Sequence, residues 1–178
     1  LLYPARYKGA WGGRGSGKTR SFAKMAAVRA YMWAKTGREG IILCVRQFMN
    51  SLSDSSLEEI KAAIRSEEWL APHFDIGENY IRTLDGRVSF SFVGLARNID
   101  SVKSKSRILL CWADEAEPIT EEAWVKLIPT LREEDSELWV TWNPEIEGSA
   151  TDKRFKQEEK EKIVEINYRD NPKFPAIL

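Results

Sequence analysis

The chain has 178 residues, enough for one domain with a buried core, and 43% of them are hydrophobic and 30% charged. This composition excludes a disordered chain, and no apolar run reaches the length of a transmembrane helix or signal peptide, so we expect no membrane contact. Lys plus Arg number 27 and Asp plus Glu number 27, so the net charge is zero. A dedicated duplex-DNA binder usually has a basic excess, so any contact with double-stranded DNA should be weak in this chain alone.

Two cysteines and one histidine limit the redox and metal chemistry. Cys44 and Cys111 lie in apolar, strand-like runs, so we expect buried free thiols in a reducing cytosol. His73 has no cysteine cluster to join, which argues against a zinc site.

The first predicted elements are a strand at 7–11, a glycine-rich loop, and a helix on which Met25, Val28 and Met32 recur at helical spacing. The loop fits the pattern G-x-x-x-x-G-K-[ST] at every fixed position. Strand, loop and helix in this order are the context that a phosphate-binding loop requires. Its residues are Gly12, Gly13, Arg14, Gly15, Ser16, Gly17, Lys18 and Thr19.

The chemistry of this loop points to ATP with Mg²⁺. Glycines let the backbone curl so that its N–H groups face a β-phosphate, and the helix dipole adds positive potential there. Lys18 would bridge the β- and γ-phosphates, and the Thr19 hydroxyl would hold Mg²⁺. We place Arg20, directly after the motif, in the same nucleotide-binding set. The alternative is a Gly/Ser turn before a helix that happens to carry a lysine, and the context favours nucleotide binding.

The next segments predict a buried strand at 41–45, which ends at Arg46, and then a helix. We expect Arg46 to line the nucleotide pocket in a supporting role. The helix begins with a capping box at Ser55 or Ser56, each with a glutamate three residues later. Its apolar face is Leu57, Ile60 and Ile64.

A hairpin is predicted at 80–93, around the turn Asp85-Gly86. Residues 97–107 then carry four basic side chains and one acid, which could contact DNA phosphates, although a solvated loop is the simpler interpretation. The basic residues are Arg97, Lys103, Lys105 and Arg107.

The apolar strand 108–112 is followed closely by two adjacent acids, Asp114 and Glu115. This is the Walker B arrangement of an ATPase. Asp114 would hold Mg²⁺ through its water shell, and Glu115 would orient and deprotonate the attacking water. The alternative is an acidic helix N-terminus favoured by the helix dipole. The phosphate loop earlier in the chain makes the catalytic interpretation the stronger one.

The last segments predict a helix from Thr120 that Pro129 bends or shortens, strands at 138–142 and 163–167, and an exposed helix with many ion pairs at 152–165. Thr141-Trp142-Asn143-Pro144 closes the first of these strands. Asn-Pro is a common turn, but Thr141 or Asn143 could also lie beside the γ-phosphate as a sensor of hydrolysis; the local sequence leaves both open.

Strands that alternate with helices around a phosphate loop predict an α/β fold of the P-loop NTPase (RecA-like/ASCE) type. We expect a three-layer sandwich with a mainly parallel central sheet and a peripheral β-hairpin. Ligands of such sheets bind at the carboxyl ends of the strands, where all the polar segments above would gather.

Several separated motifs resemble, in order, the large terminase subunit of tailed bacteriophages. They are GGRGSGKT, VRQFMNSLSDSSLEEIKAAI, VGLARNIDSVKSKSRILLCWADEAEPITEEAW, TWNP and NYRDNP, and they span essentially the whole chain. The resemblance implies the ATPase part of a motor that packs viral double-stranded DNA into a preformed capsid. It implies as partners a small terminase subunit, a portal ring and sister subunits, in the host cytoplasm on the procapsid.

The resemblance also implies roles for single residues. Arg14 would be the loop arginine that senses or stabilises the γ-phosphate, Glu115 the catalytic carboxylate, and 141–144 the coupling motif, with Thr141 and Asn143. The family's adenine-binding segment precedes the loop, where this chain offers Tyr3, Arg6 and Tyr7. We expect residues 1–178 to form the ATPase domain alone, without the family's C-terminal nuclease.

Other phosphate-loop proteins fit less well. A small-molecule kinase needs no Asp-Glu pair and no TWNP, a helicase needs a second motor domain, and a transporter ATPase needs an LSGGQ-like signature. A helicase-like motor fragment or a nucleotide-gated module that binds ATP without hydrolysis are the alternatives. Glu115 argues against a pure binder, which needs no general base.

Overall fold

The computed structural model describes residues 3, 5–48, 56–158 and 162–172. They form one eight-stranded sheet in the order β3-β4-β5-β2-β6-β7-β1-β8. The strands are β1 (Tyr7–Trp11), β2 (Gly40–Arg46), β3 (Phe74–Ile76), β4 (Ile81–Thr83), β5 (Val88–Gly94), β6 (Ile108–Ala113), β7 (Glu137–Trp142) and β8 (Ile163–Glu165). The helices are α1 (Lys18–Lys35), α2 (Ser56–Arg65), α3 (Leu95–Lys103) and α4 (Glu121–Leu127). Shorter helical segments are η1 (Ala71–His73), η2 (Ile128–Thr130), η3 (Asp152–Glu158) and η4 (Tyr168–Asp170).

The sheet is mainly parallel, as the sequence predicts. β5, β2, β6, β7, β1 and β8 run parallel to one another, while β4 is antiparallel to both β3 and β5. The predicted hairpin is therefore confirmed as β4 and β5. Its second strand also pairs along its whole length with β2, so the hairpin extends one edge of the sheet.

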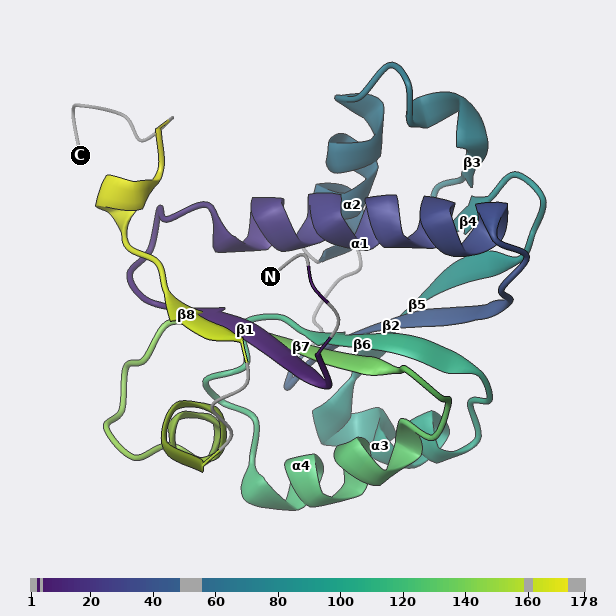
Figure 1. Ribbon diagram of the computed structural model, residues 1–178. Helices are drawn as coiled ribbons and strands as arrows, with labels where there is room; N and C mark the ends of the chain where they lie inside the picture. The colour runs from purple at the N-terminus through teal and green to yellow at the C-terminus, as the bar shows by residue number, and fades with distance from the viewer. Residues whose placement is uncertain (1–2, 4, 49–55, 159–161, 173–178) are drawn as a thin grey trace.

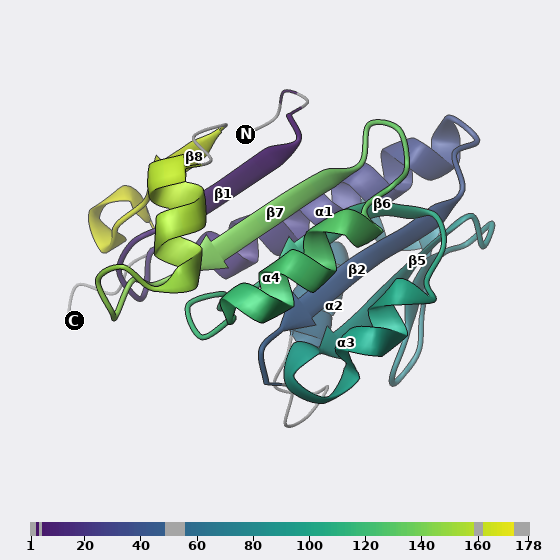
Figure 2. The same cartoon turned by 90° about the horizontal axis from the view of Figure 1, so that it is seen from below.

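Helices cover both faces of the sheet, so the predicted three-layer sandwich is confirmed. Figure 1 shows α1 and α2 above the sheet and α3 and α4 below it. Seen from below, α4 crosses β6 and β7, and η3 lies over the β1–β8 side (Figure 2). One core lies between the sheet and α1 with α2, and a second core lies between the sheet and α3 with α4.

The predicted helix after the phosphate loop is confirmed as α1, and the three residues that mark its spacing lie beside its core face. Met25 and Val28 are only half-buried and Met32 is 50% exposed, while the residues against the sheet are mostly small. Small side chains let the helix approach the sheet closely, where the large rings of Trp112 and Trp139 fill the core beneath it. The buried residues of α1 include Phe22, Ala23, Ala26, Ala27, Ala30 and Trp33.

Two predictions about the charged segments are wrong. Residues 97–107 are not a loop, because most of them lie in α3. The exposed helix predicted at 152–165 is shorter, and it is a π-helical segment whose Asp152 and Phe155 are buried. Phe155 packs on the ring of Trp124, so this helix has a core face that its charged residues conceal in the sequence.

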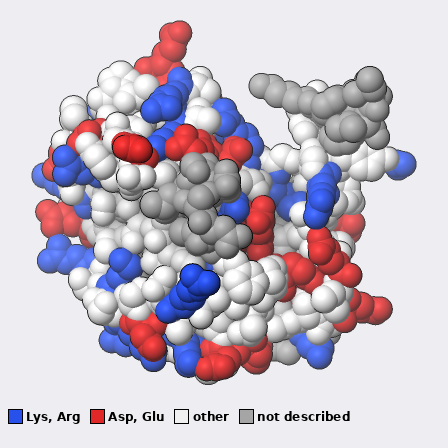
Figure 3. All heavy atoms as spheres, turned by 180° about the vertical axis from the view of Figure 1, so that it is seen from behind, with Lys and Arg blue, Asp and Glu red and all other residues white. Residues whose placement is uncertain are grey.

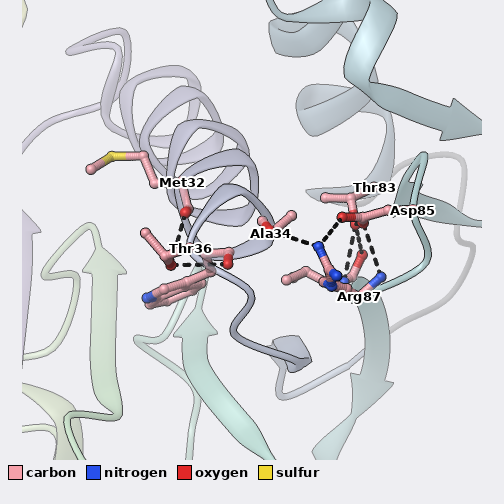
Figure 4. A network of polar contacts seen from close by, with 8 residues as sticks. Met32, Ala34, Thr36, Thr83, Asp85 and Arg87 are labelled. Carbon is pink, nitrogen blue, oxygen red and sulfur yellow. Dashed lines mark hydrogen bonds and ion pairs between the residues drawn. The ribbon is translucent and has the colours of Figure 1, made fainter.

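The ends of α4 lie where the sequence predicts them. Thr120 caps α4 by accepting the N–H of Ala123, and α4 gives way to η2 just before Pro129. Ser56 begins α2, whereas the alternative cap Ser55 lies outside the described residues. The end of α1 is tied to the hairpin, because Arg87 donates to the carbonyl oxygen of Ala34 (Figure 4).

The remaining composition-based predictions concern the thiols and the membrane. Cys44 and Cys111 are buried free cysteines, as expected. They lie on neighbouring strands but in different cores, on opposite faces of the sheet. Burial raises the pKa of both thiols. Among the described helices, none combines the length and apolar character needed to cross a membrane.

Candidate nucleotide-binding site

The predicted site segments meet at one edge of the sheet, because their strands are parallel. The phosphate loop leaves β1 at this edge, Arg46 ends β2, Asp114 follows β6, and Thr141 lies near the end of β7. Since β7 lies between β1 and β6, Thr141 is placed between the strand of the loop and the strand of the acids.

The phosphate loop depends on glycine at two positions in particular. Gly12 has φ 139°, and a Cβ added there would lie 2.2 Å from the carbonyl oxygen of Ile166. Gly17 has φ 77° and is the N-cap of α1. Both conformations are unfavourable for residues with a side chain, so these glycines allow the sharp path from strand to helix.

The Lys18 side chain folds back into the loop. Its Nζ donates to the carbonyl oxygens of Gly12 and Gly13, both at 2.9 Å, and to Ser16 Oγ at 2.8 Å. Burial lowers the pKa of Lys18, and the negative charge of Asp114 opposes this shift. The ammonium group is thus held inside the loop by oxygen atoms that phosphate oxygens could replace.

Asp114 is the centre of the buried part of the site. It is 1% exposed and accepts hydrogen bonds from two strands and two helices around it. Its Oδ1 accepts from Thr19 Oγ1 at 3.2 Å and from Thr141 Oγ1 at 2.8 Å. Its Oδ2 accepts from Ser56 Oγ at 3.2 Å and pairs with Arg46 at 2.5 Å. Asp114 therefore joins the phosphate loop to β2, β7 and α2.

Glu115 has a different environment although it follows Asp114 directly. Its φ of 49° is in the left-handed region, which costs energy for a residue with a side chain. Hydrogen bonds hold the backbone on both sides: Asp114 N donates to Val45 O at 3.0 Å, and Ala116 N donates to Thr141 O at 2.9 Å. This turn directs the Glu115 side chain outward, where it is 66% exposed.

Arg46 connects the two acids. One guanidinium nitrogen pairs with Asp114, and another lies 3.3 Å from Glu115 Oε2. Arg46 thus contacts the exposed acid as well as the buried one.

The other two predicted arginines lie on either side of this centre. Arg14 is 86% exposed and pairs with Glu145 at 3.3 Å. Arg20 points to α2, where it lies 3.6 Å from Glu59 and donates to the carbonyl oxygen of Ala62. The structure therefore places the Arg14 guanidinium on the phosphate loop and the Arg20 guanidinium away from it.

The segment after β7 also reaches the phosphate loop. Thr141 contacts Asp114, whereas Asn143 is half-buried at the start of the segment. The backbone N–H groups of Glu145 and Ile146 donate to Glu117 Oε1, at 3.3 and 3.1 Å. These bonds set the position of Glu145, and through it that of Arg14.

Arg6 and Tyr7 lie at the amino end of β1, away from the carboxyl ends of the strands. Arg6 donates to Ser136 and to the carbonyl oxygen of Leu131, and Tyr7, the first residue of β1, packs on Phe155. In this structure neither side chain lies at the carboxyl edge, so neither is placed to contact an adenine ring there.

Three contacts in the site were not predicted from the sequence. Ser56 reaches Asp114 from α2. Asn167 and Asn171, after β8, bond to Gly13 and Gly15 of the phosphate loop. The motif NYRDNP that contains both asparagines was visible, but nothing in it indicates its partner.

The fold, with a phosphate loop and two acids at the carboxyl ends of its parallel strands, defines the chain as a protein of the P-loop NTPase class. The family model of the phage terminase large subunit matches residues 5–175, so the chain belongs to that family. A comparison with curated protein sequences gives no match.

Solved structures show the same fold at low sequence identity. The large terminase of a thermophilic bacteriophage is 16% identical with a TM-score of 0.77, over 97% of this chain and 43% of that one. Structures of that terminase also exist with ADP and with ATP-γ-S; the latter is 14% identical with a TM-score of 0.71, over 97% of this chain and 42% of that one. The large terminase ATPase domain of Thermus phage P74-26 is 14% identical with a TM-score of 0.62, over 93% of this chain and 76% of that one. The chain thus has the fold of a terminase ATPase domain and spans less than half of the first of these proteins.

Proposed function

We propose that this chain binds ATP with Mg²⁺ at the carboxyl edge of its sheet and hydrolyses it. The observation that carries the proposal is the contact between the Thr19 hydroxyl and Asp114 Oδ1, at 3.2 Å. It unites the end of the phosphate loop with the acid of β6, the two groups that a phosphate-loop ATPase uses together. The nucleotides bound by the large terminase of the thermophilic bacteriophage are consistent with this ligand.

The residues present suit a magnesium ion. Hydroxyl and carboxylate oxygens are the ligands that Mg²⁺ prefers, with phosphate oxygens and water completing its coordination. Thr19 and Asp114 would hold the ion. When bound, Mg²⁺ would neutralise charge on the β- and γ-phosphates. No group of three or more His, Cys, Asp or Glu side chains suited to a metal occurs in the described part of the chain.

Each remaining group has a role in the transfer. Lys18 leaves its loop oxygens and binds the β- and γ-phosphate oxygens. Glu115 accepts a proton from the water that attacks the γ-phosphorus, while the bond from that phosphorus to the bridging oxygen of ADP breaks. Arg14, on the exposed side of the loop, leaves Glu145 and stabilises charge on the γ-phosphate. Arg46 supports both acids.

The segment after β7 is suited to couple hydrolysis to movement. Thr141 contacts Asp114 directly, and the chain continues through Asn143 to Glu145, the partner of Arg14. Loss of the γ-phosphate would change the contacts at both ends of this segment. We assign 141–145 as the element that transmits the nucleotide state.

The family membership extends the proposal to a motor that moves viral double-stranded DNA into a preformed capsid. Its partners would be a small terminase subunit, a portal ring and sister subunits, on the procapsid in the host cytoplasm. DNA binding by this chain alone should be weak. Its net charge is zero, and basic and acidic side chains are interspersed over the face in Figure 3. We also expect residues 1–178 to act as an ATPase without nuclease activity.

The test is the variant Lys18→Ala. It removes the ammonium group that the loop holds, so MgATP binding and hydrolysis should both be lost. Lys24→Ala is the matched control, since Lys24 lies on the same helix but is half exposed and pairs with Glu67. Phosphate release and nucleotide affinity are measured for both variants. Full ATPase activity in Lys18→Ala would contradict the proposed function.

A further inference from the structure

The segment 166–171 follows β8 and lies against the outside of the phosphate loop, as the yellow and purple parts of Figure 1 show. Trp11 O accepts the N–H of Ile166 at 2.8 Å, directly before the loop begins. The Ile166 carbonyl oxygen occupies the space that a side chain on Gly12 would need. The roles proposed above do not use this segment.

Asn167 fixes the first peptide group of the loop. Its Oδ1 accepts the N–H of Gly13 at 3.2 Å. In a planar trans peptide the N–H and the C=O point in opposite directions, so the Gly12 carbonyl is directed away from Asn167. That carbonyl oxygen accepts from Lys18 Nζ at 2.9 Å. One hydrogen bond outside the loop therefore sets the acceptor that holds the lysine inside it.

Asn171 acts on a second peptide group in the same manner. Its Nδ2 donates to the carbonyl oxygen of Gly15 at 2.7 Å. By the same geometry the N–H of Ser16 points away from Asn171. A phosphate loop binds its anion through backbone N–H groups, so the direction of this N–H matters for affinity.

Both asparagines have further hydrogen bonds that hold them, and the backbone N–H of Asn171 donates to the Tyr168 carbonyl oxygen at 3.1 Å. Asn167 Nδ2 donates to Glu165 Oε1 at 2.9 Å, which leaves Oδ1 to face Gly13. The backbone N–H of Asn167 donates to Asp170 Oδ2 at 2.8 Å, and the N–H of Asp170 returns to Asn167 O at 3.0 Å. This capping box makes η4 a short rigid support rather than a loose tail.

We propose that Asn167 and Asn171 are positioning residues of the nucleotide site, which orient two peptide groups of the phosphate loop for binding nucleotide phosphates. This inference rests on the proposed function. A displacement of 166–171 relative to β1 would move the loop through these two hydrogen bonds. The segment 166–171 is thus a second element, besides 141–145, through which the nucleotide site is coupled to the rest of the protein.

The test compares variants that keep or lose each bond in the 178-residue chain. Asn171→Ala removes the bond to Gly15, whereas Asn167→Ala removes the bonds to both Gly13 and Glu165. We expect MgADP affinity to fall about 3- to 10-fold in each, with KM for ATP rising by a similar factor and kcat changing less. Asn171→Asp loses the donor to Gly15, and its carboxylate repels that carbonyl oxygen, so the affinity should fall at least as far as in Asn171→Ala. Asn167→Asp keeps an acceptor for Gly13 but places a carboxylate against Glu165, so it is not a charge-matched partner of Asn171→Asp.

Asn79→Asp is the charge-matched control, because Asn79 is exposed before β4, near the opposite edge of the sheet. Titration with MgADP and thermal unfolding are recorded for every variant. Lower melting temperatures with unchanged MgADP affinity would show a purely structural role and overturn the positioning role. An MgADP affinity of Asn171→Asp equal to that of Asn79→Asp would do the same.

Failure of the proposed function gives a different pattern. If Lys18→Ala binds MgADP as well as the unaltered chain, the nucleotide site is misassigned and both proposals fall. If Lys18→Ala loses binding while the asparagine variants keep it, only the positioning role is overturned.

Discussion

The site consists of two regions that hold their charged groups differently. The buried centre is Asp114 with Thr141, Ser56 and Arg46, where the carboxylate is 1% exposed and each of its oxygens has two partners. The exposed rim is Arg14, Glu115 and Glu145, whose side chains are 63% to 86% exposed and connected by single ion pairs.

The contacts of the buried centre exist before a nucleotide binds, whereas the ion pairs of the exposed rim can change when it binds. Contacts in the buried centre are formed without solvent, so breaking one leaves a polar group unsatisfied. Ion pairs on the exposed rim are weak and are exchanged at little cost. The rim is therefore where a ligand or a second subunit can rearrange charge, and the centre keeps Thr19 and Asp114, the proposed metal ligands, aligned with the loop.

The largest expected effect in this comparison is that of Glu115→Gln. The amide keeps the shape of the side chain but cannot accept the proton of water, so ATP turnover should fall about 10²- to 10⁴-fold with affinity retained. Glu122→Gln, on the exposed face of α4, is the control. Steady-state hydrolysis and nucleotide titration check both. Normal turnover in Glu115→Gln would mean that another group is the general base, whereas no turnover in the unaltered chain would favour the nucleotide-gated binding module.

Arg14→Ala should reduce turnover more than affinity, because its charge is needed mainly in the transition state. Loss of one such group typically costs about 10²- to 10³-fold in kcat. The competing idea is that a neighbouring subunit supplies the catalytic arginine. Mixing Arg14→Ala with Glu115→Gln protein distinguishes the two, since recovered ATPase activity would mean that the residues serve one site from different chains.

Asp114→Asn should destabilise the fold, unlike Glu115→Gln. Arg46 would lose its buried partner, and an amide cannot accept all four hydrogen bonds, so the free energy of unfolding should fall by about 1 to 3 kcal/mol. Magnesium-dependent nucleotide binding should weaken as well. Urea denaturation and MgADP titration measure the two effects. Identical binding defects in both variants would remove the division of roles between these acids.

The smallest expected effect is that of Glu145→Gln. Its ion pair with Arg14 is exposed on both sides, so the free energy of unfolding should change by less than about 0.5 kcal/mol. Thermal unfolding with and without added salt measures this. A larger loss of unfolding free energy would show that the exposed rim stabilises the fold as the buried centre does.

The sequence predicted most of the fold and the parts of the site that lie in continuous motifs. The strand–loop–helix around Lys18 and the acids after β6 are local patterns, and parallel strands bring their ends together. The Thr120 cap was equally local. The helix after the loop was predicted correctly, but spacing alone did not show that its core face consists largely of alanines, which let a helix approach a sheet.

What the sequence did not predict depends on contacts between distant segments. Asn167 meets Gly13 across 154 residues, and Ser56 meets Asp114 across 58. Both asparagine and serine are common in turns and caps, so their residue types fit many local roles. Phe155 was hidden in the same manner, because charged neighbours surround the single ring that packs into the core.

Trp112 gives the site an optical reporter. Its indole N–H donates to Thr141 Oγ1 at 3.0 Å, and the same hydroxyl donates to Asp114. The ring is fully buried and stacks on Phe22, so bulk water does not quench it directly. A change of charge around Asp114 reaches this chromophore through one hydroxyl group, so we expect Trp112 to add a responsive component to the absorption and emission of the seven tryptophans.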